Sequence, residues 1–199
     1  MAFEGQPLVV ATRNAYKIAE LREILSGHEL IALADDVELP PEDGETFEAN
    51  ALTKARAAQR ATGRAALADD SGIAAVALGG RPGVRSARYA GPEATDEENL
   101  ARLLDQVPDD GDRSVAYVCA IAYVDPHGSE RSFEARCEGT LTHRPRGDGG
   151  FGYDPAFVPI ETGPDDPRTM AELSPAEKHA ISHRGRAARA LAEWLERQR

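Results

Sequence analysis

The stretch LVVATRNAYKIAELREIL at residues 8–25 decides the fold class, because its pattern changes from that of a strand to that of a helix. Residues 8–11 form a short apolar run typical of a buried strand, and apolar residues then recur at helical spacing from Ile18 to Leu25. Asn14 between them is a good N-cap, and Ser26-Gly27 ends the helix. A strand that leads directly into a helix is typical of α/β proteins.

Strands and helices continue to alternate outward from this unit. Further strands are expected at 29–34, 65–68, 114–124, 131–141 and 157–160, with an extended segment at 73–78. Helices are expected at 46–61, from Thr95 with a capping box, from Ser174, from Ser182 and at the C-terminal end. The turn DPHG at 125–128 makes a hairpin of its flanking strands. The sequence predicts one α/β domain over residues 1–199, with a mixed central sheet, flanking helices and two lobes around a substrate cleft.

Composition excludes several classes of protein. A net charge of -11 over 199 residues argues against binding long nucleic acids. No apolar run is long enough to span a membrane, and the N-terminal residues do not resemble a secretion signal, so we expect a cytoplasmic protein with no membrane partner. Cys119 and Cys137 fall in strand-like runs and are expected to be buried thiols, although the predicted hairpin leaves a disulfide open.

The charges are unevenly distributed. Residues 38–48 carry five acidic residues and no Lys or Arg, whereas the tail from Arg184 carries five Arg and two Glu. An acidic zone that holds a divalent cation and a basic zone that holds phosphate would suit a small anionic substrate. The alternative is that the acidic run is an ordinary solvated loop.

The segment Asp69-Asp70-Ser71-Gly72 follows a short apolar run, where the end of a strand would present carboxylates to a cleft. Adjacent residues of a strand point to opposite sides, so only one acid need face the site. That carboxylate could hold Mg²⁺ or accept a proton from water. The alternatives are an Asp-rich turn before Gly and the D-[ST]-G motif of aspartic proteases.

The turn from Thr12 to Lys17 could hold an anion, because the backbone N–H groups at a helix start are free and Lys17 lies one turn inside. The alternative is a plain N-cap. Asn50 and Lys54 stand one helical turn apart, so they share a face that either contacts phosphates or is solvated. No G-x-x-x-x-G-K-[ST] motif is present, which argues against a P-loop protein.

Two C-terminal segments could bind a flat ligand. In GGFGYDP at 149–155, glycines flank two aromatic residues that could stack on a base or pack inward. In KHAISHRG at 178–185, His183 and Arg184 could donate hydrogen bonds to a carbonyl oxygen or a phosphate, or could form an ordinary basic helix end. The Glu of a zinc-protease H-E-x-x-H motif is absent from this second segment.

Taken in order, these segments resemble the inosine/xanthosine triphosphate pyrophosphatase family, and the resemblance covers nearly the whole chain. The matching motifs are T-x-N-x-x-K at 12–17, F-E-x-N-A-x-x-K-A at 47–55, A-D-D-S-G at 68–72, P-G-x-x-S-A-R-Y at 82–89, G-G-F-G-Y-D-P at 149–155 and E-K-x-A-I-S-H-R-G at 177–185. Arg13 departs from the pattern, since Gly is common at that position.

The resemblance implies Mg²⁺-dependent hydrolysis of ITP, dITP or XTP to the monophosphate and pyrophosphate, usually by a homodimer. It implies that Asp70 is the metal-associated general base and that Glu42 is the second metal ligand, with Glu45 as a competitor for that place. The substrate would contact Thr12, Arg13, Asn14, Ala15, Tyr16, Lys17, Lys54 and Ser71. The base pocket would contain Phe151, Gly152, Tyr153, Asp154, Lys178, His183 and Arg184. Asp69 would support this site, and a nucleotide-binding sensor without turnover is the alternative function.

Overall fold

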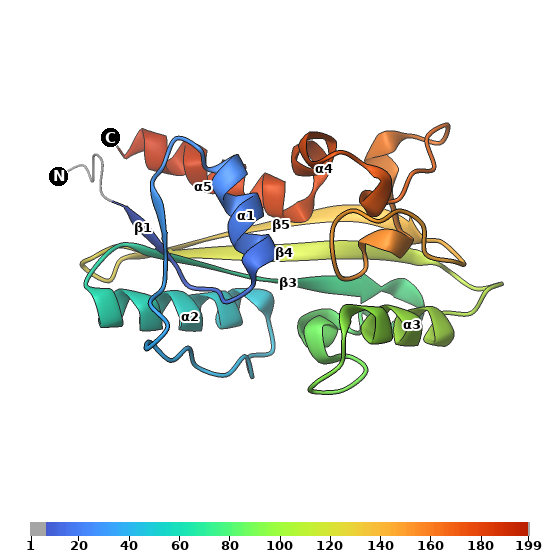
Figure 1. Ribbon diagram of the computed structural model, residues 1–199, viewed down its shortest axis with the longest axis horizontal. Coiled ribbons are helices and arrows are strands. Elements are labelled where there is room, and N and C mark those ends of the chain that lie inside the picture. The colour runs from blue at the N-terminus through green and yellow to red at the C-terminus, as the bar shows by residue number, and fades with distance from the viewer. Residues whose placement is uncertain (1–6, 199) are drawn as a thin grey trace. The chain divides into compact units, whose positions relative to one another are not determined.

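The computed structural model, drawn in Figure 1, describes residues 7–198. These residues contain a six-stranded sheet in the order β2-β1-β3-β4-β5-β6. The strands are β1 (Leu8–Val10), β2 (Leu30–Ala32), β3 (Ala66–Ala75), β4 (Ser114–Val124), β5 (Glu130–Leu141) and β6 (Phe157–Pro159). The α-helices are α1 (Ala15–Ile24), α2 (Phe47–Thr62), α3 (Asp96–Gln106), α4 (Pro175–Ile181) and α5 (His183–Arg197). β1 runs parallel to β2 and β3, whereas β5 and β6 are antiparallel, which confirms a mixed α/β sheet.

The chain divides into two compact units. Within the described range, the first unit consists of residues 7–70, 119–135 and 184–198, and the second consists of residues 71–118 and 136–183. Each unit has its own buried core.

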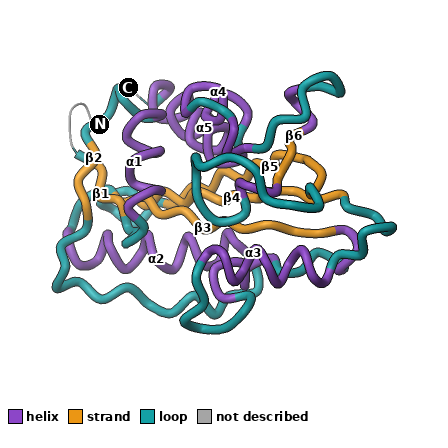
Figure 2. The backbone as a smooth tube through the Cα atoms, turned by 45° about the vertical axis from the view of Figure 1, so that its right-hand side comes forward, coloured by secondary structure: helices purple, strands orange, loops and turns teal. Residues whose placement is uncertain are grey.

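In the first unit, alternate strand residues point to opposite faces of the sheet. Leu8, Val10 and Leu67 pack with residues of α1 and α5, whereas Val9, Ala66 and Ala68 pack with the alanines of α2. Figures 1 and 2 show the same arrangement, with α1 and α5 on one side of β1 and α2 on the other. The face of a side chain on β3 therefore follows from whether its residue number is odd or even.

In the second unit, α3 and the chain after β5 share one core. Thr95 caps α3 through a complete capping box, and Leu100 and Leu103 pack with Ile73 and Tyr117. Tyr153, before β6, and Met170, after it, are buried in the same cluster, so the segments on either side of β6 are tied to the core.

Most predicted elements are present, but two predicted bounds between residues 65 and 78 are wrong. The strand expected at 65–68 does not end there: β3 continues through Asp69-Asp70-Ser71-Gly72 to Ala75, so the alternative of an Asp-rich turn does not apply. Residues 76–78, which are expected to be extended, form a 3₁₀ turn. The predicted hairpin is confirmed, because β4 and β5 are neighbours joined by a turn in which Asp125 N–H donates to Ser129 O at 2.9 Å.

Two further expectations concern the cysteines and the membrane. Cys119 and Cys137 are both buried and free, so the disulfide that the sequence left open is absent from the described residues. Among residues 7–198, no helix is both long and apolar enough to cross a membrane.

Candidate active site

The adjacent carboxylates of β3 face opposite sides of the sheet, as strand geometry requires. Asp69 points to the same face of the sheet as Leu67, toward α1 and α5. Asp70 points to the same face as Ala68, toward α2. Asp69 is fully buried and Asp70 is 5% exposed. The two neighbours in sequence therefore differ in the side chains that contact their carboxylates.

Asp69 lies in a buried ion network. Lys17 Nζ from α1 is 3.0 Å from Asp69 Oδ2, and Arg184 from α5 donates to the same oxygen through Nε and Nη2, both at 3.1 Å. Arg184, only 2% exposed, also pairs with Glu20. Burial would raise the pKa of Asp69, but Lys17, Arg184 and Lys54 together hold it well below its usual range. Asp69 therefore stays ionised.

Asp70 faces a different set of groups. Its Oδ2 accepts a hydrogen bond of 2.8 Å from Asn50 Nδ2. Burial raises the pKa of Asp70; Lys54 opposes that shift and Glu42 adds to it. A carboxylate whose proton affinity is raised is better suited to accept a proton than an ordinary aspartate.

Asn50 and Lys54 are buried, so the shared face of α2 is not a solvated stripe. Asn50 Oδ1 accepts from the backbone N–H of Gly44 at 2.8 Å, which ties the acidic loop to the residue that contacts Asp70. Lys54 Nζ donates to Asp69 O at 2.8 Å and pairs with Glu42. Burial would lower the pKa of Lys54, but the carboxylates around it raise that pKa, so the side chain remains an ammonium.

The two glutamates that the sequence left as alternative metal ligands have different surroundings. Glu42 is drawn to Lys54 and lies close enough to Asp70 to raise its pKa, whereas Glu45 is exposed. Among the described residues there is no group of three or more His, Cys, Asp or Glu arranged to hold a metal. Mg²⁺ commonly uses only one or two carboxylates together with substrate phosphates, and Glu42 and Asp70 match that donor set.

The turn before α1 confirms the predicted N-cap. Asn14 Oδ1 accepts from Lys17 N at 3.1 Å, and Thr12 Oγ1 accepts from Asn14 N at 3.2 Å. Ala15 is the first residue of α1, and Tyr16 is 61% exposed. These residues surround the helix start at which a phosphate was predicted to bind.

Arg13 reaches away from that helix start to the segment after β2. Its guanidinium donates to Leu33 O at 3.0 Å, Ala34 O at 2.9 Å and Val37 O at 2.7 Å. The side chain therefore fastens the segment that leads into the acidic loop. Its contact with substrate stays a prediction.

In the second unit, three of the matching motifs meet at Ser86. Ser86 Oγ accepts from Ile73 N at 2.9 Å, and Ser86 O accepts from Tyr153 Oη at 2.7 Å. A Cβ on Gly72 would lie 2.3 Å from Ser86 Oγ and 2.5 Å from Gly83 O. The glycine of A-D-D-S-G is thus required for close packing and not for a turn, and Tyr153 packs inward.

Asp154 and Lys178 form a buried ion pair beside Phe151. Lys178 Nζ lies 2.7 Å from Asp154 Oδ2 and 4.9 Å from the centroid of the Phe151 ring. Asp154 Oδ2 also accepts from Phe151 N at 2.9 Å, and Asp154 Oδ1 accepts from Tyr117 Oη at 3.0 Å. His183 stacks on Tyr117 with ring centroids 4.5 Å apart. Four predicted base-pocket residues therefore lie in one contact network.

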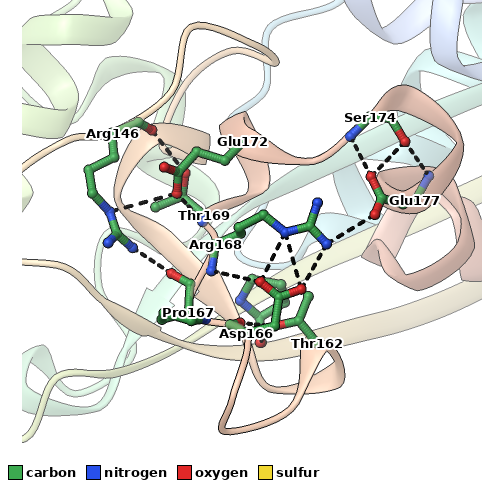
Figure 3. Close-up of polar contacts among 10 residues, drawn as sticks. Arg146, Thr162, Asp166, Pro167, Arg168, Thr169, Glu172, Ser174 and Glu177 are labelled. Carbon is green, nitrogen blue, oxygen red and sulfur yellow. Dashed lines mark hydrogen bonds and ion pairs between the residues drawn. The ribbon is translucent and has the colours of Figure 1, made fainter.

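A polar network fixes the start of α4 (Figure 3). This helix also carries Lys178. Ser174 and Glu177 form a capping box, and Arg168 joins Glu177 to Asp166. Hydrogen bonds from Ser174 and Arg168 lower the pKa of Glu177 to about 2. Nearby, Thr169 and Glu172 form a second capping box, and Arg146 donates to Pro167 O.

The structure also shows partners that the sequence did not single out. Glu20 pairs with Arg184 across 164 positions of sequence, and Tyr117 contacts Asp154 across 37. No local motif signals such pairs. The sequence indicates only which face of α1 carries Glu20 and which face of β4 carries Tyr117. Arg184 was predicted in the base pocket, whereas the ion pairs described above are with Glu20 and Asp69 in the first unit.

Comparison with known proteins identifies the family. The Ham1 family profile matches residues 8–194. A dITP/XTP pyrophosphatase of Mycobacterium tuberculosis is 53% identical over 189 residues, which is 90% of each chain, and one of Cutibacterium acnes is 50% identical over 192 residues, covering 92% of this chain and 93% of the relative.

Solved structures agree with this match. A HAM1 protein from Coxiella burnetii superposes with a TM-score of 0.86 at 41% identity, covering 96% of this chain and 98% of the other. A nucleoside-triphosphatase / dITP/XTP pyrophosphatase from Mycobacterium abscessus has a TM-score of 0.74 at 47% identity, covering 94% and 98%. Profile, sequence and structure all match over nearly the full length, and the chain therefore belongs to the Ham1 family.

Proposed function

We propose that this protein hydrolyses non-standard purine nucleoside triphosphates, namely ITP, dITP and XTP, to the monophosphate and pyrophosphate. Membership of the Ham1 family supports this function, as do relatives at 50–53% identity that are dITP/XTP pyrophosphatases. The observation that carries the proposal is the contrast between two adjacent carboxylates. Asp69 is neutralised by Lys17 and Arg184, whereas Asp70 faces Asn50, with Lys54 and Glu42 close by.

Asp70 is assigned as the general base. It takes a proton from the water that attacks the α-phosphorus, and the pyrophosphate oxygen leaves on the opposite side of that phosphorus. Asn50 holds the Asp70 carboxylate in place through the 2.8 Å hydrogen bond. Lys54 and Lys17 place positive charge near the carboxylates, and the N-terminus of α1 would favour the phosphate chain.

Glu42 and Asp70 are proposed to hold Mg²⁺. Two carboxylates near one ammonium fit a cation that shares its coordination with phosphate oxygens. When bound, Mg²⁺ would neutralise charge on the phosphates and on the leaving pyrophosphate.

The purine base is proposed to bind near Phe151 and Lys178. The Phe151 ring offers a stacking surface, and a lysine ammonium is the kind of donor that recognises the 6-oxo group of inosine and xanthine and not the 6-amino group of adenine. The substrate cleft, the homodimer and the cytoplasmic location expected from the sequence stay predictions.

Pyrophosphate release from ITP, dITP, XTP and ATP, with and without Mg²⁺, tests this proposal. We expect Mg²⁺-dependent release from the first three and little from ATP, and Asp70→Asn should abolish turnover while preserving the fold. Asp110→Asn, which changes an exposed carboxylate before β4, is the matched control. Tight binding of ITP without any pyrophosphate release would indicate a nucleotide sensor, and near wild-type turnover by Asp70→Asn would exclude Asp70 as the base.

A further inference from the structure

We propose that Tyr117 is a positioning residue for base selection: it fixes the Asp154 carboxylate and the His183 ring, and so sets the preference for 6-oxo purines. This inference rests on the proposed function, and it concerns a residue outside the motifs that carry the family resemblance. Tyr117 lies in β4 and is 6% exposed.

The Tyr117 hydroxyl controls the orientation of Asp154. It donates to Asp154 Oδ1 at 3.0 Å, while Asp154 Oδ2 accepts from Lys178 Nζ at 2.7 Å and from Phe151 N at 2.9 Å. A carboxylate held through both oxygens cannot rotate without breaking a bond. Asp154 is only 3% exposed, so water does not readily replace a lost donor.

Loss of the Tyr117 hydroxyl should therefore change the orientation of the residues proposed to contact the base. The Asp154 carboxylate would turn to recover a donor for Oδ1, and the Lys178 ammonium would follow the charge that it pairs with. Phe151 would be affected as well, since its backbone N–H bonds the same oxygen.

The Tyr117 ring provides a second constraint. It lies nearly parallel to the His183 ring, at an interplanar angle of 11° and a centroid distance of 4.5 Å, and it contacts the Phe157 ring at 4.5 Å. His183 is 5% exposed. The stack limits rotation of the imidazole, so one side chain orients residues from two separate base-pocket segments.

The contacts of Tyr117 given above do not involve Asp70, the proposed general base. The partners of the Tyr117 side chain described here belong to the segments 151–157 and 178–183, whereas Asp70 is held by Asn50 of α2. Tyr117→Phe should consequently alter substrate choice far more than the chemical step.

The experiment compares wild type, Tyr117→Phe and Tyr123→Phe on ITP and ATP. Tyr123 is the matched control: it is a buried tyrosine of the same strand whose ring packs against Trp194, in the first unit. For Tyr117→Phe we expect about a tenfold rise in KM for ITP with kcat within about twofold, and about a tenfold loss of the ITP-over-ATP ratio in kcat/KM. The Mg²⁺ dependence should not change, and Tyr123→Phe should match the wild type.

Two results would overturn the proposal: an unchanged ITP-over-ATP ratio in Tyr117→Phe, or a fall in kcat of equal size for both nucleotides, which indicates only a structural role. Calorimetric titration with ITP and ATP in the absence of Mg²⁺ separates this inference from the proposed function. If the wild type releases no pyrophosphate, the proposed function fails, and the titration still decides the role of Tyr117 by whether the preference for ITP falls.

Discussion

Replacement of Asp69 by Asn should strongly destabilise the protein, although the two side chains have almost the same shape. Asp69 Oδ2 accepts both Arg184 donors at 3.1 Å and lies 3.0 Å from Lys17 Nζ. Arg184 is 2% exposed and the Lys17 side chain is 13% exposed. Asparagine would remove the negative charge and leave two largely buried cations together.

The size of the effect follows from these contacts. Removal of one partner of a buried ion pair costs about 3–5 kcal/mol. Arg184 keeps its pair with Glu20, so we expect the lower end, about 3 kcal/mol. For a chain of this length, that loss corresponds to a fall in Tm of about 6–12 °C.

Asp70→Asn is the internal control, because the same substitution at the neighbouring carboxylate should have the opposite effect on stability. Burial raises the pKa of Asp70, so the ionised carboxylate reduces stability at neutral pH. An asparagine keeps an oxygen for the Asn50 donor and carries no charge. Its Tm should equal or exceed that of the wild type, while turnover is lost.

Thermal and urea unfolding of both variants, recorded from pH 7 down to pH 3, provide the measurement. The pKa of Asp69 is held below its unfolded value, so its contribution to stability is complete at pH 7 and declines as the pH falls below about 4. The difference in Tm between the wild type and Asp69→Asn should therefore become smaller as the pH falls. Equal losses of Tm for the two variants, or a change below about 2 °C for Asp69→Asn, would refute this account of the network.

Three more predictions each concern a single residue. Gly72→Ala should lower the free energy of unfolding by about 1–3 kcal/mol in urea, because its Cβ would lie 2.3 Å from Ser86 Oγ, and an unchanged midpoint would contradict that packing. Cys119, whose pKa burial raises to about 12, should resist alkylation at pH 8 until the protein is unfolded; full labelling of the native protein would show that the site opens. Arg13→Ala should raise the Mg²⁺ concentration needed for half-maximal activity, because the segment 33–37, which leads into the acidic loop and to Glu42, loses the hydrogen bonds of the Arg13 guanidinium; an equal requirement in both proteins would show that the loop is held without Arg13.

Much of the fold could be predicted from the sequence because its local signals agree with one another. The helices begin at the caps that the sequence indicates, Asn14, Thr46, Thr95 and Ser174. The exception is instructive: Asp69-Asp70-Ser71-Gly72 has the composition of a turn but continues β3. Pairing with neighbouring strands and partners for the charges outweigh the local preference, and neither is visible within four residues.

The candidate site was predictable only in part. Strand alternation correctly predicts that the two carboxylates point apart, but it does not say which one is neutralised. That depends on Lys17 and Arg184, which helices α1 and α5 bring to Asp69 from distant positions. Likewise, Arg13 has the composition of a phosphate ligand, yet it contacts backbone carbonyls of residues 33–37. Contacts between residues distant in sequence therefore determine whether a basic side chain of the first unit pairs with a carboxylate or with backbone carbonyls.

The Asp69 network raises the question of why the first unit gathers four charged side chains, of which Asp69 and Arg184 are buried and Lys17 and Glu20 are largely shielded from solvent. A buried ion cluster is no more stable than well-packed apolar residues of similar volume, so stability alone does not explain it. Its effect is to hold the start of α1 and the start of α5 against β3, beside Asp70.

We therefore expect that replacing the whole cluster by apolar residues preserves stability but impairs turnover. The variant carries Lys17→Met, Glu20→Leu, Asp69→Leu and Arg184→Met. A Tm within a few degrees of the wild type, with kcat for ITP reduced at least about a hundredfold, is the expected result. Full activity in a folded variant would show that the cluster has no part in positioning the site, and loss of folding would show that these charges are needed for stability after all.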